Sequence, residues 1–439
     1  MSFLDSVDWG SLVAFFGEHG KLIATAIAFI VGLISLMVAY LKYRHGKIED
    51  GVRRQLERLL KQKQVNLEIT LAEVEIKQKA LEQAANELRR QRDDISKREV
   101  VINSIRAAFK GKEGELWCMH TARPPNTYSR LGARGRKPII LVANLKGGVG
   151  KTTLTANLAA FFNERGKRVL LLDCDYQGSL SNMVQSADRV TEVPAGMIDL
   201  LSPGADSSTF ARVRRPFSNV LRRASIVPAR YELASLENRI LIEYLLQESQ
   251  DDGRYRLANA LLSDEAIDSF DVALIDAPPR LTAAAINGFC ASTHLLIPTL
   301  YDGLSSEAVG TFIDGFRTLK RSLNHEINPL GVVGMLTYRT EDLGREQDAK
   351  EKTRRQILET WQLDIPFFDR HIPRKASIAK AAGESIAYYD DPVVRDLFDQ
   401  LGDEISRRLG FGTHEPRRSV GRTQLRVEPQ ILQEAEATS

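Results

Sequence analysis

The sequence contains little cysteine. Its 439 residues include Cys118, Cys174 and Cys290, which stand far apart, form no CxxC pair and have no histidine cluster nearby. This spacing disfavours a disulfide framework and a structural zinc module, and it fits a reducing compartment.

An excess of charge of one sign is also lacking. Lys and Arg total 60 and Asp and Glu total 57, which leaves a formal net charge of +3. This balance argues against a chain that coats nucleic acid along its whole surface, and against an acidic disordered chain. Hydrophobic residues make up 43% of the sequence, which is enough to fill a core. The length corresponds to roughly two or three domains.

Charge is absent from one segment near the N-terminus. Residues 22–40 (LIATAIAFIVGLISLMVAY) contain no charged residue and no proline, and with Leu41 they are long enough to cross about 30 Å of hydrocarbon as a helix. We therefore predict a transmembrane helix at 22–41. A secretory signal peptide fits less well, because the apolar run is too long and no basic segment precedes it. A buried core helix is a further alternative.

The charges on either side of this segment predict its orientation. Lys42, Arg44 and Lys47 follow it, whereas residues 1–21 contain a single Lys and no Arg. Cytoplasmic flanks are enriched in Lys and Arg. We therefore expect residues 1–21 to be a short extracytoplasmic N-terminus, and the rest of the chain to lie in the cytoplasm.

Proline is missing from residues 47–110, and Gly51 is the one glycine there. Apolar residues recur at every seventh position, which predicts a coiled-coil stalk. The second apolar position of each heptad is mostly polar, so self-association, packing on a partner protein and a single solvated helix remain alternatives. The seventh-position residues are Leu60, Leu67, Val74, Leu81, Leu88, Ile95, Ile102 and Phe109.

Residues 111–137 are expected to form a linker. They contain Pro124 and Pro125, followed by a basic run among glycines. As an alternative, Trp117 and Met119 within this segment could dock against a folded domain.

From Pro138 onwards, short β-branched runs alternate with segments long enough for helices. This alternation predicts an α/β domain at 138–411 with a doubly wound, mostly parallel sheet. The polar stretch 412–439 has no apolar face, and we expect it to be disordered. Strands are predicted at 139–144, 168–173, 271–276, 294–299 and 331–336.

The first predicted strand leads into the run KGGVGKTT at 146–153. Glycines allow backbone N–H groups to surround phosphate oxygens, and a helix predicted at 153–164 presents its N-terminus to the same charge. Lys151 is expected to reach the β- and γ-phosphates, and the Thr152 hydroxyl to bind Mg²⁺. The candidate nucleotide-binding residues are Gly147, Gly148, Val149, Gly150, Lys151, Thr152 and Thr153.

Four segments together resemble the ParA/MinD family of deviant Walker ATPases, and are nearer to ParA. They are KGGVGKTT, LLLDCDYQGSLSN (170–182), DVALIDAPP (271–279) and IPRKASIAKA (372–381). The resemblance covers about residues 137–409. It implies a P-loop NTPase fold, hydrolysis of ATP with Mg²⁺, and a homodimer that closes on ATP.

The resemblance also implies roles for individual residues. Lys146 matches the lysine that crosses the dimer interface to the partner's phosphates, and with Lys151 and Asp175 it forms the candidate catalytic set. Asp175 matches the acid that positions the attacking water. Asp276 matches the Walker B acid, so Thr152, Asp173 and Asp276 are the candidate metal residues. From the residues alone, Lys146 could instead be a solvated loop lysine, and Asp173 and Asp175 could cap the next element.

Two departures from the family pattern accompany these roles. The family has proline after the second acid, where this chain has Tyr176, so the hydrolysis rate stays open. The family binds DNA without sequence preference through basic residues late in the domain, and Arg374 and Lys375 stand at the matching place. They are candidate DNA contacts, or alternatively surface charges at a helix start.

These features lead to one functional hypothesis and two alternatives. The hypothesis is an ATPase anchored in the bacterial inner membrane, which dimerises on ATP, opens on hydrolysis and positions or regulates an unidentified partner. One alternative is a bacterial tyrosine kinase of the polysaccharide-export type. The other is a non-cycling membrane scaffold locked by ATP, for example in defence against phage.

Overall fold

The computed structural model describes residues 9–44, 50–111, 114–133, 137–188, 196–301, 303–337, 343–361 and 365–411. The chain divides into two compact units, residues 1–103 and 104–439, which are described separately. The first part of the predicted extracytoplasmic segment, residues 1–8, and the predicted disordered tail at 412–439 lie outside the described residues.

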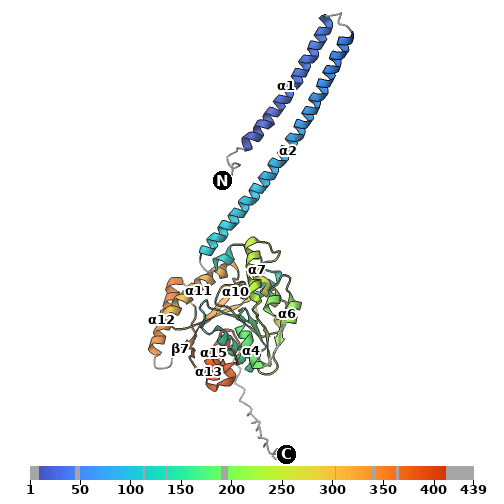
Figure 1. Cartoon of the computed structure of the whole chain (residues 1–439). Coiled ribbons are helices and arrows are strands. Elements are labelled where there is room, and N and C mark those ends of the chain that lie inside the picture. Colours follow the sequence, from blue (N-terminus) through green and yellow to red (C-terminus); the bar gives the residue numbers. More distant parts are fainter. Residues whose placement is uncertain are drawn as a thin grey trace, which may run out of the picture. The chain divides into compact units, whose positions relative to one another are not determined.

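The first unit contains helix α1 (Trp9–Arg44) and most of helix α2 (Asp50–Lys110). Within α1, Thr25–Tyr43 has a mean hydropathy of 2.0 and is long enough to cross a membrane. The helix runs beside the first part of α2 (Figure 1), where the Nζ atom of Lys42 lies 3.9 Å from Oε1 of Glu57. Large side chains of α1 remain uncovered by this packing, since Phe29 is 69% exposed and Leu36 is 71% exposed.

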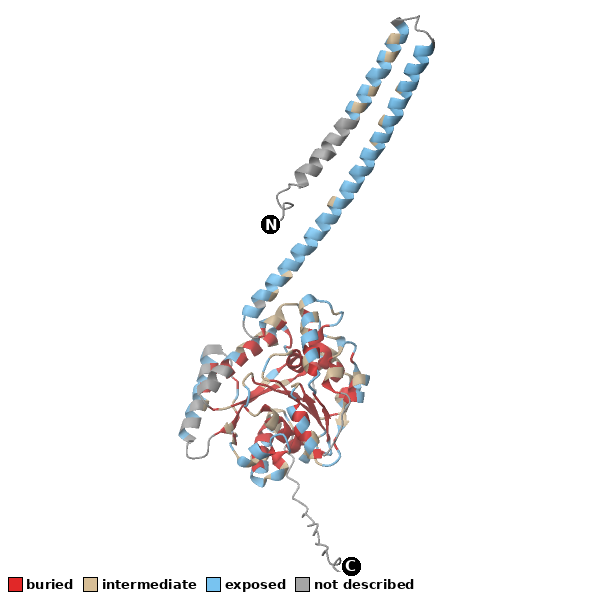
Figure 2. Cartoon of the chain, viewed as in Figure 1, coloured by how far each residue is buried: buried red, intermediate tan, exposed pale blue. Residues whose placement is uncertain are grey.

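The apolar stripe of α2 is also uncovered in the single chain (Figure 2). From Val74 to Phe109, every seventh residue has at least two fifths of its surface exposed. The prediction of one long helix agrees with α2, and the self-associating coiled coil stays a prediction.

The second unit is built on an eight-stranded sheet with the order β3-β4-β2-β5-β1-β6-β7-β8. Its strand pairs are parallel except for β3 with β4, which confirms the predicted α/β fold with a mostly parallel sheet. The strands are β1 (Ile139–Val142), β2 (Val169–Asp173), β3 (Arg215–Pro216), β4 (Ala224–Val227), β5 (Val272–Asp276), β6 (His294–Thr299), β7 (Asn328–Thr337) and β8 (Ile372–Pro373).

Helices cover both faces of this sheet (Figure 1), because successive strand residues point to opposite faces. Ile139 and Leu141 face one core, which is closed by α6 (Ser207–Val213), α7 (Leu233–Leu246), α8 (Arg256–Leu261), α10 (Ala283–Ala291) and α11 (Gly303–Ser322). Ile140 and Val142 face the other, closed by α3 (Lys151–Glu164), α4 (Ser179–Asp188), α13 (Ala376–Ala381), α14 (Ala387–Asp390) and α15 (Pro392–Arg408). The remaining helices are α5 (Met197–Leu200), α9 (Asp264–Asp268), α12 (Leu343–Trp361) and the 3₁₀ helices η2 (Glu115–Cys118), η3 (Asn126–Gly132) and η4 (Gly253–Tyr255).

Residues 114–133, within the segment expected to be a linker, pack on the domain. Trp117 in η2 is 3% exposed and Leu131 in η3 is fully buried, and both belong to the core that contains Leu141. Arg130 donates from Nη1 to the carbonyl of Leu262 (2.8 Å) and pairs with Asp264. The alternative of a docked Trp117 is therefore correct, because burying an indole outweighs the loop-like composition around it. We call residues 114–133 the connector.

Candidate functional site

The carboxyl end of β1 leads into the glycine-rich loop, whose backbone takes conformations that favour glycine. Gly148 has a φ of +72° and Gly150 a φ of +83°. A Cβ atom on Gly147 or Gly148 would meet no other atom within 4 Å, so this side of the loop borders open space. Asn144 fixes the start of the loop, accepting from the Lys146 N–H at 3.0 Å and donating to the Pro298 carbonyl at 2.8 Å.

Lys151 begins α3 with its ammonium group turned into the loop. The residue is 8% exposed, and Nζ donates to the carbonyl oxygen of Lys146 at 3.1 Å. Burial lowers the pKa of Lys151, while the nearby carboxylates of Asp276 and Asp175 act in the opposite direction. A buried cation beside open glycine backbone is suited to an anionic ligand.

Two acidic residues end neighbouring strands at the same edge of the sheet. Asp173 of β2 and Asp276 of β5 are partners in the strand register, and both are almost fully buried. The Thr152 hydroxyl donates to Oδ2 of Asp276 at 2.7 Å. Burial, followed by the charge of Asp173, raises the pKa of Asp276. A cation between these groups would offset that cost of burial.

Asp173 is tied to its own chain. Its Oδ2 accepts from the backbone N–H and the hydroxyl of Ser181, at 2.9 and 2.7 Å, and its Oδ1 accepts from the Asp175 N–H at 3.0 Å. Burial raises the pKa of Asp173, and these hydrogen bonds oppose that rise. The carboxylate therefore holds the turn between β2 and α4, as the capping alternative suggested.

Asp175 lies half-buried in that turn, and its Oδ1 accepts from the Gln177 N–H at 3.0 Å. The next residue, Tyr176, replaces the proline of the family pattern. Its ring packs on the core and lies 5.9 Å from the ring of Tyr231 between centroids. The aromatic contact provides an anchor for the turn where a proline would have provided stiffness.

Arg374 and Lys375 follow β8, which is parallel to β7. They therefore lie at the carboxyl end of the parallel strands, where the glycine-rich loop and Asp276 also lie. The Arg374 N–H donates to the Thr337 carbonyl at the end of β7 (2.9 Å). The Arg374 side chain is exposed and that of Lys375 half-buried. The helix α13 begins directly after them, which is compatible with both alternatives for these residues.

The donor set suits magnesium bound together with phosphates. Mg²⁺ usually takes one or two carboxylates plus phosphate oxygens and water, rather than a cage of protein ligands. Among the described residues, no group of three or more His, Cys, Asp and Glu could hold a metal. Asp276 and Thr152 therefore provide a small oxygen set of the kind that a nucleotide-bound magnesium needs.

The structure brings Lys151, Thr152, Asp173 and Asp276 together at the carboxyl end of β2 and β5, and their roles in binding a nucleotide and a metal stay predictions. It adds three residues that the sequence did not single out: Asn144, Ser181, and Thr155, whose hydroxyl lies 3.4 Å from Oδ1 of Asp276. Asn144 is the last residue of the first predicted strand, directly before the glycine-rich run, and that place was the available signal. Ser181 lies in the segment 170–182 that carries the family resemblance, but no role was assigned to it, and Thr155 carries no motif that could have marked it.

A parallel sheet whose first strand runs through a glycine-rich loop into a helix, with an acid at the end of a nearby strand, defines a P-loop nucleoside triphosphatase. The family described as "AAA domain" matches residues 137–329. Over 260 residues the chain is 31% identical to the sporulation initiation inhibitor protein Soj of Bacillus subtilis, covering 57% of this chain and 91% of that protein. The chromosome partitioning protein ParA of Caulobacter vibrioides is 27% identical, with 57% and 87% covered.

The fold has counterparts among solved structures. A variant of Cyanothece McdA in complex with ATP aligns with a TM-score of 0.51 at 18% identity, covering 64% of this chain and 99% of that one. The similarity to Soj places the chain in the ParA/MinD family of P-loop ATPases. The region that matches the family starts at residue 137, so α1, α2 and the connector lie outside it.

Proposed function

We propose that this ATPase is a membrane-anchored switch, in which two chains close on ATP and separate after hydrolysis. The observation that carries the proposal is the 2.7 Å hydrogen bond from Thr152 to Asp276, with Lys151 buried beside the open glycine loop. Phosphoryl transfer needs positioning and charge neutralisation more than covalent help from the protein, and these groups supply both.

In the proposed cycle each residue has one task. The loop N–H groups and Lys151 hold the phosphates of ATP. Thr152 and Asp276 hold Mg²⁺, which when bound neutralises charge on the phosphates. Asp175 orients the attacking water, and Asp173 keeps the turn in place by accepting from the Asp175 N–H. Lys146 completes the site of the second copy.

The membrane part of the proposal rests on α1. Its Thr25–Tyr43 stretch is apolar, and the packing on α2 leaves much of it exposed. We infer that residues 22–41 within α1 cross the inner membrane, with residues 1–21 outside and the ATPase domain in the cytoplasm. Lys63 and Gln64 of α2 line the groove beside α1. Charged and polar side chains are costly inside a bilayer, so α1 can insert into the membrane only after it separates from α2.

Fractionation of cells tests the anchor. The full chain is expected in the membrane fraction after washing at alkaline pH, whereas a variant lacking residues 1–44 is expected in the supernatant. A shortened chain that stays in the membrane fraction would contradict the assignment of α1. A full chain released by the alkaline wash would contradict it as well.

Light scattering of the full chain in detergent tests the switch. We expect the mass to double with ATP and Mg²⁺ but not with ADP, and Lys146→Ala to remain monomeric while still binding ATP. Lys352→Ala on α12 removes an exposed lysine elsewhere and should dimerise normally. A monomer in saturating ATP, or a dimer of Lys146→Ala, would refute the proposed switch.

Incubation with γ-labelled ATP separates the kinase alternative from this proposal. An export-type kinase would label its own tyrosines, whereas the proposed switch releases labelled phosphate into solution and leaves the chain unlabelled.

A further inference from the structure

The connector is held on the ATPase domain by a buried ion pair. Arg254 is 1% exposed, and its Nη2 atom lies 2.7 Å from Oδ2 of Asp252. Nη1 donates to the carbonyls of Trp117 (2.6 Å) and His120 (3.1 Å). Oδ2 of Asp252 accepts from the Arg123 N–H at 3.0 Å. The pair therefore binds the connector's main chain from both sides, as a charged pair with satisfied hydrogen bonds does when it is buried.

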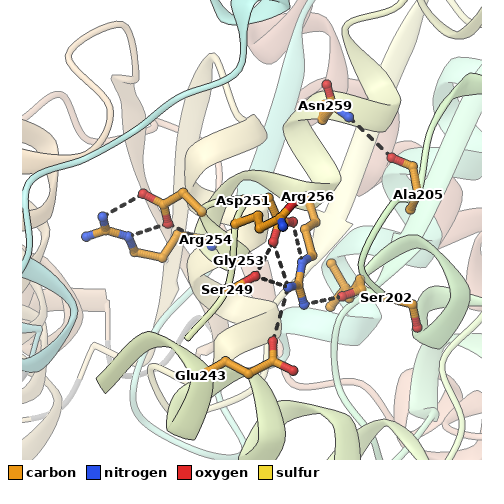
Figure 3. Close-up of polar contacts among 12 residues, drawn as sticks. Ser202, Ala205, Glu243, Ser249, Asp251, Gly253, Arg254, Arg256 and Asn259 are labelled. Carbon is orange, nitrogen blue, oxygen red and sulfur yellow. Dashed lines mark hydrogen bonds and ion pairs between the residues drawn. The ribbon is translucent and has the colours of Figure 1, made fainter. Parts of the chain in front are cut away.

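A second arginine stiffens the platform that carries this pair. Arg256 donates to Asp251, Ser249 and Glu243 (Figure 3). Its Nη1 atom also donates to the Leu201 carbonyl at 3.1 Å. These bonds join the start of α8 to α7, to the loop 249–251 and to the residue that follows α5. The connector thus rests on a base that resists movement.

Trp117 extends from this base to a loop that follows Asp276. Its indole Nε1 donates to the carbonyl oxygen of Leu281 at 2.8 Å. Leu281 belongs to the loop 277–282, which joins Asp276 at the end of β5 to the start of α10. The sequence of this loop, APPRLT, offers few backbone donors of its own because of its two prolines.

Other contacts hold the far end of the same loop. Thr282 caps α10, accepting from the Ala285 N–H at 3.3 Å, and Glu237 of α7 accepts from the Ala284 N–H at 3.1 Å. The hydrogen bond from Trp117 differs from these two, because Trp117 lies outside the region shared with the family, 137–329.

A cavity of about 440 Å³, lined by Trp117, Tyr176 and Arg280 among others, borders the loop. The loop therefore has room to shift beside a densely packed interior.

We propose that Trp117 is a positioning residue, which sets the conformation of the loop 277–282 and so links the state of the nucleotide site to the connector that follows α2. It acts through Leu281 and touches no reacting group. The inference rests on the proposed ATPase switch. It adds that the connector contacts the loop 277–282, which follows Asp276.

Replacing the indole tests this role in the full chain. Trp117→Phe keeps an aromatic ring and removes the Nε1 donor. Losing one hydrogen bond of ordinary strength to a group that orders the site is expected to lower kcat about fivefold, with KM for ATP unchanged within about twofold. The matched control is Tyr128→Phe, which removes another bond from the connector, from the hydroxyl to the Leu323 carbonyl (3.2 Å), and should leave kcat unchanged.

Equal effects of the two substitutions would overturn the proposal, because a purely structural connector would lose similar stability in both. An unchanged kcat in Trp117→Phe would overturn it as well. Melting temperatures of both variants, measured in the same detergent, show whether they are folded to the same extent.

Fluorescence gives a second measurement that leaves Trp117 in place. The chain has three tryptophans. In the double variant Trp9→Phe with Trp361→Phe, Trp117 is the sole tryptophan, and excitation at the red edge of the absorption band selects its emission over that of the tyrosines. We expect its emission to shift when Mg²⁺ and a non-hydrolysable ATP analogue are added, and to return with ADP. No response at saturating analogue would refute the link, even if light scattering shows that the chain dimerises, so this failure is distinct from failure of the switch itself.

Discussion

Asp173 and Asp276 are register partners in neighbouring strands, yet each carboxylate accepts from a hydroxyl of a different helix. Ser181 of α4 donates to Asp173, and Thr152 at the start of α3, directly after the glycine-rich loop, donates to Asp276. Asp173 therefore holds the turn that follows it, whereas Asp276 faces the loop where a nucleotide would bind.

This division predicts different effects for the two hydroxyls. Thr152→Val should lower ATP turnover by about a hundredfold, because it removes an oxygen from the proposed magnesium site. Ser181→Ala should mainly lower the free energy of unfolding, by about 1–3 kcal/mol, because it leaves a buried carboxylate oxygen and the Ala229 N–H with fewer partners. Phosphate release and urea unfolding measure the two effects. Similar turnover in both variants would contradict the assignment.

Asp175 is the residue that distinguishes a cycling switch from a locked scaffold. We expect Asp175→Ala to bind ATP and dimerise like the wild type, but to hydrolyse ATP at least about a hundredfold more slowly. Phosphate release and light scattering of the same preparations measure both properties. If the wild type also fails to hydrolyse ATP while both proteins dimerise, the non-cycling scaffold is the correct function.

The ion pair beneath the connector should contribute far more to stability than an exposed pair. Asp252→Ala leaves Arg254 charged and buried, which is expected to cost about 3–5 kcal/mol of unfolding free energy. Asp271→Ala breaks the pair with Arg168, whose side chain is 47% exposed, and should cost less than about 1 kcal/mol. Chemical denaturation of the full chain in detergent gives both values. A cost at Asp252 no larger than at Asp271 would show that the connector is held loosely.

Arg374 and Lys375 are proposed to contact DNA phosphates. The double variant Arg374→Ala with Lys375→Ala should weaken binding to duplex DNA of any sequence, and should reduce the salt dependence of the logarithm of the binding constant by about two units. Arg407→Ala changes an exposed arginine in the last turn of α15 and serves as the control. Binding that is unaffected by the double variant, or equal with ATP and ADP, would favour surface charges with no such role.

The sheet could be predicted where its strands are long and apolar. β1, β2, β5 and β6 are almost entirely buried, and uninterrupted apolar runs mark them in the sequence. β4 was missed because its sequence, ASIV, is short and half small or polar, and its burial comes from the neighbouring β2. The two-residue strands β3 and β8 are defined by their partners and leave no pattern of their own.

The phosphate loop could be predicted for a related reason, since its chemistry lies in one contiguous run. The buried ion pairs that hold the connector could not be predicted from the sequence. The run DDGRYR at 251–256 has the composition of a solvated turn, and its arginines are buried only because Asp251, Asp252 and Glu243 are arranged around them. Such pairing depends on tertiary neighbours, which a single sequence does not display.

The position of the connector also determines where this protein can be shortened. A recombinant fragment that begins at residue 137, the first residue shared with the family, would lose Trp117 and Leu131 from the core. It would also leave the buried Arg254 without the main-chain carbonyls to which it donates. Such a fragment would be expected to aggregate or to hydrolyse ATP poorly for reasons unrelated to its active site. A fragment that retains residues 114–136 keeps the hydrophobic core closed and is the appropriate soluble form for crystallisation.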